Sequence, residues 1–297
     1  MSSIPVLFVG KYQHEKGELP YLSNALVQAK KSGNELILLG QSHDLADQCY
    51  PLENYETSAL EFDKVYQHMT FNAFGREIMA FRRWFIVRDF MKKEGIRKLF
   101  LCENDVLLYA NISTLLADYD KSALCTPIDQ AELDWCSSGH CALWFYDDVD
   151  YLCDLSLQYY NDKLDVLKKK WQYHQDHKLA GGICDMTLLY FLTKERELEN
   201  LNVVKNGCVF DHNISVSDNA YKGEYELDAC RIKKTYLSNG RYAINNMLTN
   251  DLVVANTLHF SGTAKNFLPL FGSEFLMNFH LLRTVLVAMS KLKNRYL

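Results

Sequence analysis

Three short segments near the start of the chain constrain its fold most strongly. Residues 6–9 are wholly apolar and end at Gly10, as expected for a strand that is buried on both faces. Residues 19–31 place apolar or small side chains at helical spacing, and residues 35–39, a glutamate followed by four apolar residues, form a second strand-like run that ends at Gly40. A strand, a helix and a strand in this order predict a βαβ unit, which requires a parallel sheet.

The rest of the chain continues this alternation, although residues 41–70 show weak periodicity and are predicted to be irregular. The best helical pattern covers residues 74–93 and is followed by a strand at 99–102. We expect one α/β domain over residues 1–270 and an amphipathic helix within residues 271–297. The other predicted segments are strands at 123–126, 141–146, 203–210, 241–244 and 252–260, and helices at 149–170, 185–192 and 275–293.

Composition argues against several classes of protein. The net charge of −5 and the isoelectric point near 6.0 argue against a surface that binds nucleic acid. The nine cysteines never form a Cys-x-x-Cys pattern, which argues against a zinc site or a disulfide framework and suits a reducing compartment. The N-terminus lacks a signal-peptide pattern, and no apolar stretch reaches the roughly 18 residues of a membrane span. We therefore expect a cytoplasmic protein.

Two carboxylates stand between two apolar runs. Glu103 and Asp105 follow the predicted strand at residues 99–102 and precede the run at 106–109. A carboxylate beside a core is costly unless it is paired, and a divalent cation on a phosphorylated substrate would be such a partner. The alternative is that both acids end a strand and face solvent. Ligands of open α/β sheets bind beyond the carboxyl ends of the strands, where both acids lie, and this favours the metal site.

Other polar residues share this predicted edge of the sheet. Gly10 and Lys11 follow the first strand. Asp44 follows the second strand, where it could accept hydrogen bonds from a ribose or could be a plain surface acid. Gly10 is a single glycine, so the dinucleotide-binding pattern G-x-G-x-x-G is not present at this turn.

A second polar cluster follows the apolar run at residues 252–260. His259 can ligate a cation, Gly262 permits a sharp turn that brings backbone amides near an anion, and Lys265 can contact a phosphate. A lone histidine more often has a structural role. Histidine, glycine and lysine together in one loop favour a ligand site.

The order of these residues resembles the motifs of the GT-A nucleotide-sugar glycosyltransferases, and of glycosyltransferase family 8 in particular. That family carries Asp-x-Asp followed by apolar residues, and residues 103–105 here read Glu-Asn-Asp before Val-Leu-Leu. The family also carries His-x-x-Gly-x-x-Lys-Pro-Trp, and residues 259–265 read His-Phe-Ser-Gly-Thr-Ala-Lys before Asn-Phe. Residues 137–140 resemble the Asn-Ser-Gly strand of the family, residues 181–185 its acidic helix start, and Arg83 the arginine in the helix before the acids.

The resemblance implies a GT-A fold, which is a Rossmann-like, mixed and mostly parallel sheet flanked by helices. It implies an enzyme that moves a sugar from a nucleoside diphosphate sugar, with UDP as the expected nucleotide, to a glycan or another hydroxyl acceptor. Glu103, Asp105 and His259 would then hold Mn²⁺ or Mg²⁺. Arg83 and Asp185 would face the sugar and the acceptor, and Asp185 would be the base of an inverting reaction. The residues expected to bind the nucleotide-sugar are Gly10, Lys11, Asp44, Asn104, Gly262 and Lys265.

Departures from the family pattern keep other interpretations open. Glutamate replaces the first aspartate at position 103, Asn-Phe replaces Pro-Trp at 266–267, and the acidic segment is reduced to Asp185. A catalytically inert relative that binds sugar or protein is one alternative. A metal-dependent nucleotidyltransferase is another, although residues 9–12 lack the glycine-rich loop that it would need. The C-terminal helix, basic toward its end, could dock on the domain or lie on an anionic membrane surface.

Overall fold

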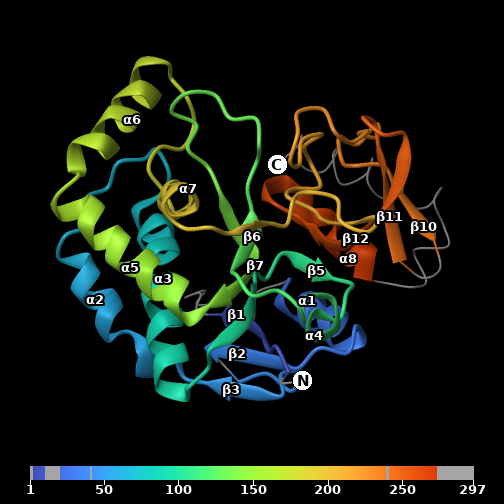
Figure 1. The fold of residues 1–297 in the computed structure, drawn as a ribbon, viewed down its shortest axis with the longest axis horizontal. Coiled ribbons are helices and arrows are strands. Elements are labelled where there is room, and N and C mark those ends of the chain that lie inside the picture. Colours follow the sequence, from blue (N-terminus) through green and yellow to red (C-terminus); the bar gives the residue numbers. More distant parts are fainter. Residues whose placement is uncertain (1–2, 11–20, 41, 239–240, 273–297) are drawn as a thin grey trace, which may run out of the picture.

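The structure is a computed structural model that describes residues 3–10, 21–40, 42–238 and 241–272 (Figure 1). Lys11 and the predicted helix at residues 275–293 lie outside this part of the chain. None of the described helices is both long and apolar enough to cross a membrane.

The first sheet has seven strands and is mixed but mostly parallel, as the resemblance implies. Only β7 runs against its neighbours, β4 and β6, while the other neighbouring pairs are parallel. At the end of the β1–β2 pair, Gly10 is the register partner of Gly40. A Cβ atom on Gly40 would lie 2.8 Å from the carbonyl oxygen of Gly10, so this edge requires glycine. In sheet order the strands are β3 (Gln48–Tyr50), β2 (Leu36–Gly40), β1 (Val6–Gly10), β4 (Lys98–Cys102), β7 (Ser138–Phe145), β6 (Ala123–Cys125) and β8 (Glu199–Asn200).

Helices cover both faces of this sheet because successive strand residues point to opposite sides. Leu7 of β1 belongs to a core that includes Trp84 of α3, whereas Val6 and Phe8 belong to a core that includes Leu26 of α1. Figure 1 shows α2, α3, α5, α6 and α7 on the first side, and α1 and α4 on the second. These helices are α1 (Leu22–Lys31), α2 (Thr57–Asp63), α3 (Phe74–Glu94), α4 (Ile112–Leu115), α5 (Tyr146–Asn161), α6 (Leu164–Asp176) and α7 (Asp185–Glu195).

A second sheet is built from the C-terminal part of the described chain and from β5. The strands β10, β11, β12 and β5 pair antiparallel, and β9 pairs parallel with β12. The chain passes from β4 of the first sheet directly into β5 of the second, so the link between them at residues 103–105 joins the two sheets. The elements are β5 (Val106–Leu108), β9 (Cys208–Phe210), β10 (Thr235–Ser238), β11 (Arg241–Asn246), β12 (Asp251–His259), a 3₁₀ helix (Gly262–Phe267) and α8 (Leu268–Gly272).

Three sequence-based expectations about local structure are wrong. Residues 41–70 are not irregular, because they contain β3, a 3₁₀ helix (Leu52–Tyr55) and α2, whose Phe62 stacks on Phe85 at 4.9 Å. The helix expected at 149–170 is two helices, since the chain breaks between α5 and α6. The strand expected at 203–210 is only the three-residue strand β9, Cys208–Phe210. Asn206 and Gly207 adopt positive φ angles of 52° and 70°, which are incompatible with an extended strand.

Packing between β7 and α3 gives a test of this fold. A Cβ atom on Gly139 would lie 2.6 Å from the ring of the buried Trp84. Gly139→Ala should therefore lower the free energy of unfolding by about 1–3 kcal/mol. Gly75→Ala is the control: the Cβ atom would meet nothing within 4 Å and the position is helical, so stability should stay equal or rise by up to about 1 kcal/mol. Equal urea midpoints for the two variants would contradict this packing.

Candidate metal and nucleotide-sugar site

Antiparallel pairing between β5 and β12 brings the two polar clusters of the sequence together. His259, the last residue of β12, is the register partner of Val106, which follows Asp105. The amide of Phe260 donates a hydrogen bond to the carbonyl oxygen of Asp105 at 2.9 Å. The backbone thus holds the histidine beside the second acid.

The link between β4 and β5 carries both acids on a fixed turn. The amide of Glu103 donates to the carbonyl of His140 in β7 at 2.7 Å, and the amide of Val106 donates to the carbonyl of Glu103 at 3.1 Å. The side-chain amide nitrogen of Asn104 lies 3.5 Å from the carbonyl oxygen of Val9. The turn therefore lies at the carboxyl ends of β4 and β1, where the sequence predicts a ligand site.

Three side chains of this region form a compact group of potential metal ligands. One carboxylate oxygen from Glu103, one from Asp105 and one ring nitrogen of His259 all lie within 4.8 Å of one another. Asp105 and His259 are 6% and 8% exposed, and Asp105 Oδ1 lies 3.8 Å from His259 Nε2. The structure thus gathers the three residues that the sequence predicts as metal ligands.

A hydrogen bond fixes which nitrogen of His259 faces the acids. Nδ1 lies 2.5 Å from the carbonyl oxygen of His212. A carbonyl oxygen can only accept, so Nδ1 carries the proton and, in the neutral ring, Nε2 keeps its lone pair toward Asp105. Metal-binding histidines are oriented in the same way, by a carbonyl that accepts from the second ring nitrogen.

Two basic side chains neutralise the acids of this group. Lys265 Nζ lies 2.9 Å from Asp105 Oδ2. Arg83 forms ion pairs with Glu103 and with Asp185, the latter at 2.9 Å between Nη2 and Oδ2. Trp84 Nε1 donates to the same Oδ2 of Asp185 at 3.0 Å.

The surroundings shift the pKa values of Glu103 and Asp185 in opposite directions. Burial is the largest influence on the Glu103 carboxyl and would raise its pKa, but the charge and hydrogen bond of Arg83 together with the charges of His259 and Lys265 hold that pKa below its usual value. For Asp185 burial prevails over the contact with Arg83, and the pKa is raised. Glu103 therefore stays ionised, whereas Asp185 binds a proton more readily than an ordinary aspartate.

Sequence reasoning missed Asp211 and Lys233, which hold His259 in place. Their side chains are fully buried and form an ion pair at 2.6 Å. The other carboxylate oxygen of Asp211 accepts from the amide of His259 at 3.0 Å, and the carbonyl of Asp211 lies 3.0 Å from Nε2 of His140. Asp211 follows an apolar strand, as Glu103 does, so the same strand-end argument could have found it.

The structure links the remaining predicted site residues less directly to the group formed by Glu103, Asp105 and His259. Gly10 ends β1 near Asn104, whereas Lys11 lies outside the described residues. Gly262 has a φ of 60° and begins the 3₁₀ helix that carries Lys265. Asp44 is exposed in the segment between β2 and β3, and none of the described ion pairs or hydrogen bonds joins it to the acid group. Its role in binding a ribose stays a prediction.

A second group of potential ligands lies in the core and does not extend the site. Cys125 Sγ and Cys141 Sγ lie 3.9 Å apart beside His140, and all three residues are buried. Both ring nitrogens of His140 already have partners, Ser138 Oγ at 2.7 Å and the carbonyl of Asp211 at 3.0 Å. Burial raises the pKa of the Cys125 thiol well above its usual value, which disfavours the thiolate that a metal needs.

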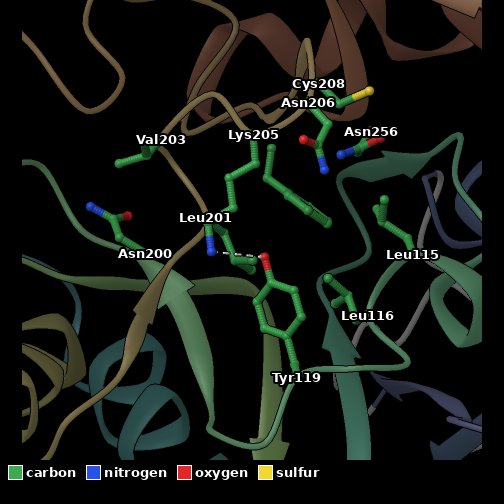
Figure 2. A pocket seen from close by; sticks show the side chains of 11 residues that line it. Leu115, Leu116, Tyr119, Asn200, Leu201, Val203, Lys205, Asn206, Cys208 and Asn256 are labelled. Carbon is green, nitrogen blue, oxygen red and sulfur yellow. Dashed lines mark hydrogen bonds between the residues drawn. The ribbon is translucent and has the colours of Figure 1, made fainter.

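A pocket of about 290 Å³ lies apart from the acid group, between α4 and the segment at residues 200–210 (Figure 2). It is lined mainly by apolar side chains, together with Asn256 of β12. Its Lys205 Nζ lies 3.3 Å from the hydroxyl of Tyr119 and 2.6 Å from Glu199, so its charge is already compensated. None of the residues predicted for the metal or nucleotide-sugar site lines it.

Comparison with known proteins gives no family for this chain. No protein-family model matches it, and no curated protein matches its sequence. The apo form of mouse xyloside xylosyltransferase 1 is similar in structure, with a TM-score of 0.43, 12% identity, and coverage of 68% of this chain and 85% of that one.

Two further solved structures are similar. The glycosyltransferase GlyE of Streptococcus pneumoniae TIGR4 has a TM-score of 0.37 and 16% identity, and the match covers 68% of this chain and 45% of that one. A glycosyltransferase involved in glycosylation of the major capsid of PBCV-1 has a TM-score of 0.30 and 13% identity, and the match covers 54% of this chain and 68% of that one. All three TM-scores lie below 0.5, so these matches do not establish an activity for this chain.

The buried Asp211–Lys233 ion pair gives a test of how the site is held. Asp211→Asn keeps the shape of the side chain but leaves the buried charge of Lys233 uncompensated, and we expect a loss of roughly 3 kcal/mol or more in unfolding free energy. The control is Glu226→Gln, which breaks the more exposed pair with Lys234 and should cost less than about 1 kcal/mol. Similar losses in the two variants, measured by urea unfolding, would refute the anchoring role.

Proposed function

We propose that this chain is a glycosyltransferase with a single GT-A-like catalytic domain. It would move a sugar from a nucleoside diphosphate sugar, with UDP as the nucleotide, to a hydroxyl of a glycan acceptor. The observation that carries the proposal is the group formed by Glu103, Asp105 and His259, with Lys265 against Asp105. This combination of acids, imidazole and lysine at the carboxyl ends of strands suits a metal-bound diphosphate.

The donor set fits Mn²⁺ or Mg²⁺. Carboxylate oxygens suit both cations, whereas an imidazole nitrogen is a softer ligand that Mn²⁺ accepts more readily than Mg²⁺. Opposite ligands of Mg²⁺ lie about 4.2 Å apart. The three atoms, all within 4.8 Å of one another, need little movement to meet one ion. When bound, the cation would offset the charge that develops on the departing nucleoside diphosphate.

Lys265 would exchange partners when substrate arrives. It pairs with Asp105 across 2.9 Å. With Asp105 as a ligand of the cation, Lys265 would be available to contact a phosphate, and the turn at Gly262 would offer backbone amides to the same phosphate. The same lysine would then stabilise the acid before binding and the diphosphate after it.

Asp185 and Arg83 would act on the acceptor side. Arg83 and Trp84 both bind Oδ2 of Asp185, and no hydrogen bond to Oδ1 is found among the described residues. In an inverting reaction, Asp185 would take the proton of the acceptor hydroxyl as its oxygen bonds to the anomeric carbon. The bond from that carbon to the diphosphate breaks at the same time. The raised pKa of Asp185 suits this proton transfer.

One observation favours an alternative function, a sugar- or protein-binding relative without catalysis. Arg83 forms an ion pair with Glu103, the residue that departs from the family pattern. A carboxylate that is paired with an arginine is a weaker ligand for a cation. A protein that no longer bound the metal could therefore keep the ion pair between Arg83 and Glu103.

Metal dependence of UDP binding tests the site. Titration calorimetry should show tighter binding of UDP in Mn²⁺ than in EDTA, and Asp105→Asn should weaken binding in Mn²⁺ about tenfold or more. In EDTA the same variant should bind UDP no more weakly than the unmodified protein, because Lys265 loses its partner and is free for phosphate.

The matched control is Asp176→Asn at the exposed end of α6, which should change neither affinity. An affinity for UDP that is independent of both Mn²⁺ and Asp105 would contradict the metal site.

Release of nucleoside diphosphate from a panel of nucleotide-sugars, with and without acceptor sugars, tests catalysis. We expect turnover by the unmodified protein, and a loss of about 100-fold or more in Asp185→Asn, since positioned general bases contribute 10²–10⁴-fold. UDP affinity in Mn²⁺ should stay within about twofold, because Asp185 is not among the proposed ligands. Mn²⁺-dependent UDP binding without any turnover would favour the inert relative.

A further inference from the structure

Phe71 and Trp171 form a pair of aromatic rings at the surface. Phe71 is 59% exposed, and the centroid of its ring lies 4.8 Å from that of Trp171 at an angle of 59°. Phe71 precedes α3, and Trp171 lies in α6. Trp171 is half-buried and packs against the core, so the apolar surface that the pair presents to solvent comes mainly from Phe71. Exposed apolar surface is costly to hydrate, and contiguous apolar surface can mark a binding site.

Backbone hydrogen bonds hold this pair to the segment that leads into α7. Thr70 forms a β-bridge with Gly182, and the amide of Phe71 donates to the carbonyl of Gly181 at 3.0 Å. The amide of Ile183 donates to the carbonyl of Met69 at 2.8 Å. These bonds make the loop at residues 69–71 and the segment at 181–183 one unit.

Close packing fixes this unit further. A Cβ atom on Gly182 would lie 2.5 Å from the carbonyl oxygen of Met69 and 2.9 Å from the ring of Trp171. Asp185, the first residue of α7, follows Gly181 by four positions, so the two Cα atoms are at most about 14 Å apart. The backbone unit that carries Phe71 therefore leads directly into Asp185, which pairs with Arg83.

We propose that Phe71 and Trp171 form an acceptor subsite that stacks the apolar face of a neutral pyranose ring. This inference rests on the proposed function, because it places the acceptor glycan on the Asp185 side of the metal group. A pyranose presents C–H groups on its faces and hydroxyls around its rim, so stacking buries apolar area while the hydroxyls stay hydrated. Both rings are uncharged, which suits a neutral sugar.

The chain offers a matched control at Phe74. Phe74 is 56% exposed, nearly as much as Phe71, but its ring packs against Tyr66 and His68. No ring contact joins it to Phe71 or Trp171 among the described residues. Phe71→Ala and Phe74→Ala thus remove the same side chain from two different aromatic groups, and neither change empties a buried core position.

Saturation-transfer NMR with lactose, cellobiose and maltose tests the subsite without requiring turnover. At least one of the three disaccharides should bind the unmodified protein, with the strongest transfer to ring C–H protons. Phe71→Ala should weaken that binding about tenfold or more, while Phe74→Ala should stay within about twofold. UDP affinity in Mn²⁺ should be the same in all three proteins.

The outcomes separate this inference from the proposed function. Absence of binding by all three disaccharides, or equal binding by Phe71→Ala, overturns the subsite. An equal loss of disaccharide binding in Phe74→Ala also overturns the subsite, because the loss would then not be specific to the pair Phe71 and Trp171. Sugar binding that depends on Phe71 in a protein that binds no UDP would support the subsite and contradict the glycosyltransferase proposal alone.

Discussion

The pairing of β5 with β12 is the constraint on which the candidate site depends. Three register pairs, the last between Val106 and His259, join β12 to β5. β5 follows β4 of the first sheet directly along the chain. Because this pairing sets the position of the turn at residues 103–105, it also sets the distance between the two acids and the imidazole. The glycine contacts at the ends of β1 and β2 and the packing of Gly139 on Trp84 hold the surrounding edge.

Compensated charge is the second feature of the site. Arg83 forms ion pairs with Glu103 and Asp185, and Lys265 forms one with Asp105. Lys233 forms an ion pair with Asp211, which also accepts a hydrogen bond from the amide of His259. Buried charges are tolerated only when they are paired, so in the proposed site a cation would have to displace a basic side chain from its acid. That exchange would couple metal binding to release of Lys265 for phosphate, and it would give the ion pairs a role beyond stability.

The sequence predicted the parts of this structure that depend on local pattern. The apolar runs of β1, β2 and β4 and the acids after β4 were identifiable because buried strands and strand ends have short-range signatures. The meeting of His259 with Asp105 has no local signature, since it depends on strand pairing between distant segments, and only the resemblance to a family suggested it. Helix α2 was missed because its seven residues bury only Ala59 and Phe62, too few to show a period. Lys233 was missed because nothing local marks a lysine for burial.

Electron spin-echo spectroscopy of the Mn²⁺·UDP complex detects the nuclei bound to the ion and so tests whether His259 is a metal ligand. We expect modulation from one imidazole nitrogen, supplied by Nε2 of His259, together with phosphorus coupling from the diphosphate. In His259→Gln the nitrogen modulation should disappear. A complex that shows no nitrogen coupling in the unmodified protein, or the same coupling in His259→Gln, would contradict the metal site proposed at the junction of the two sheets.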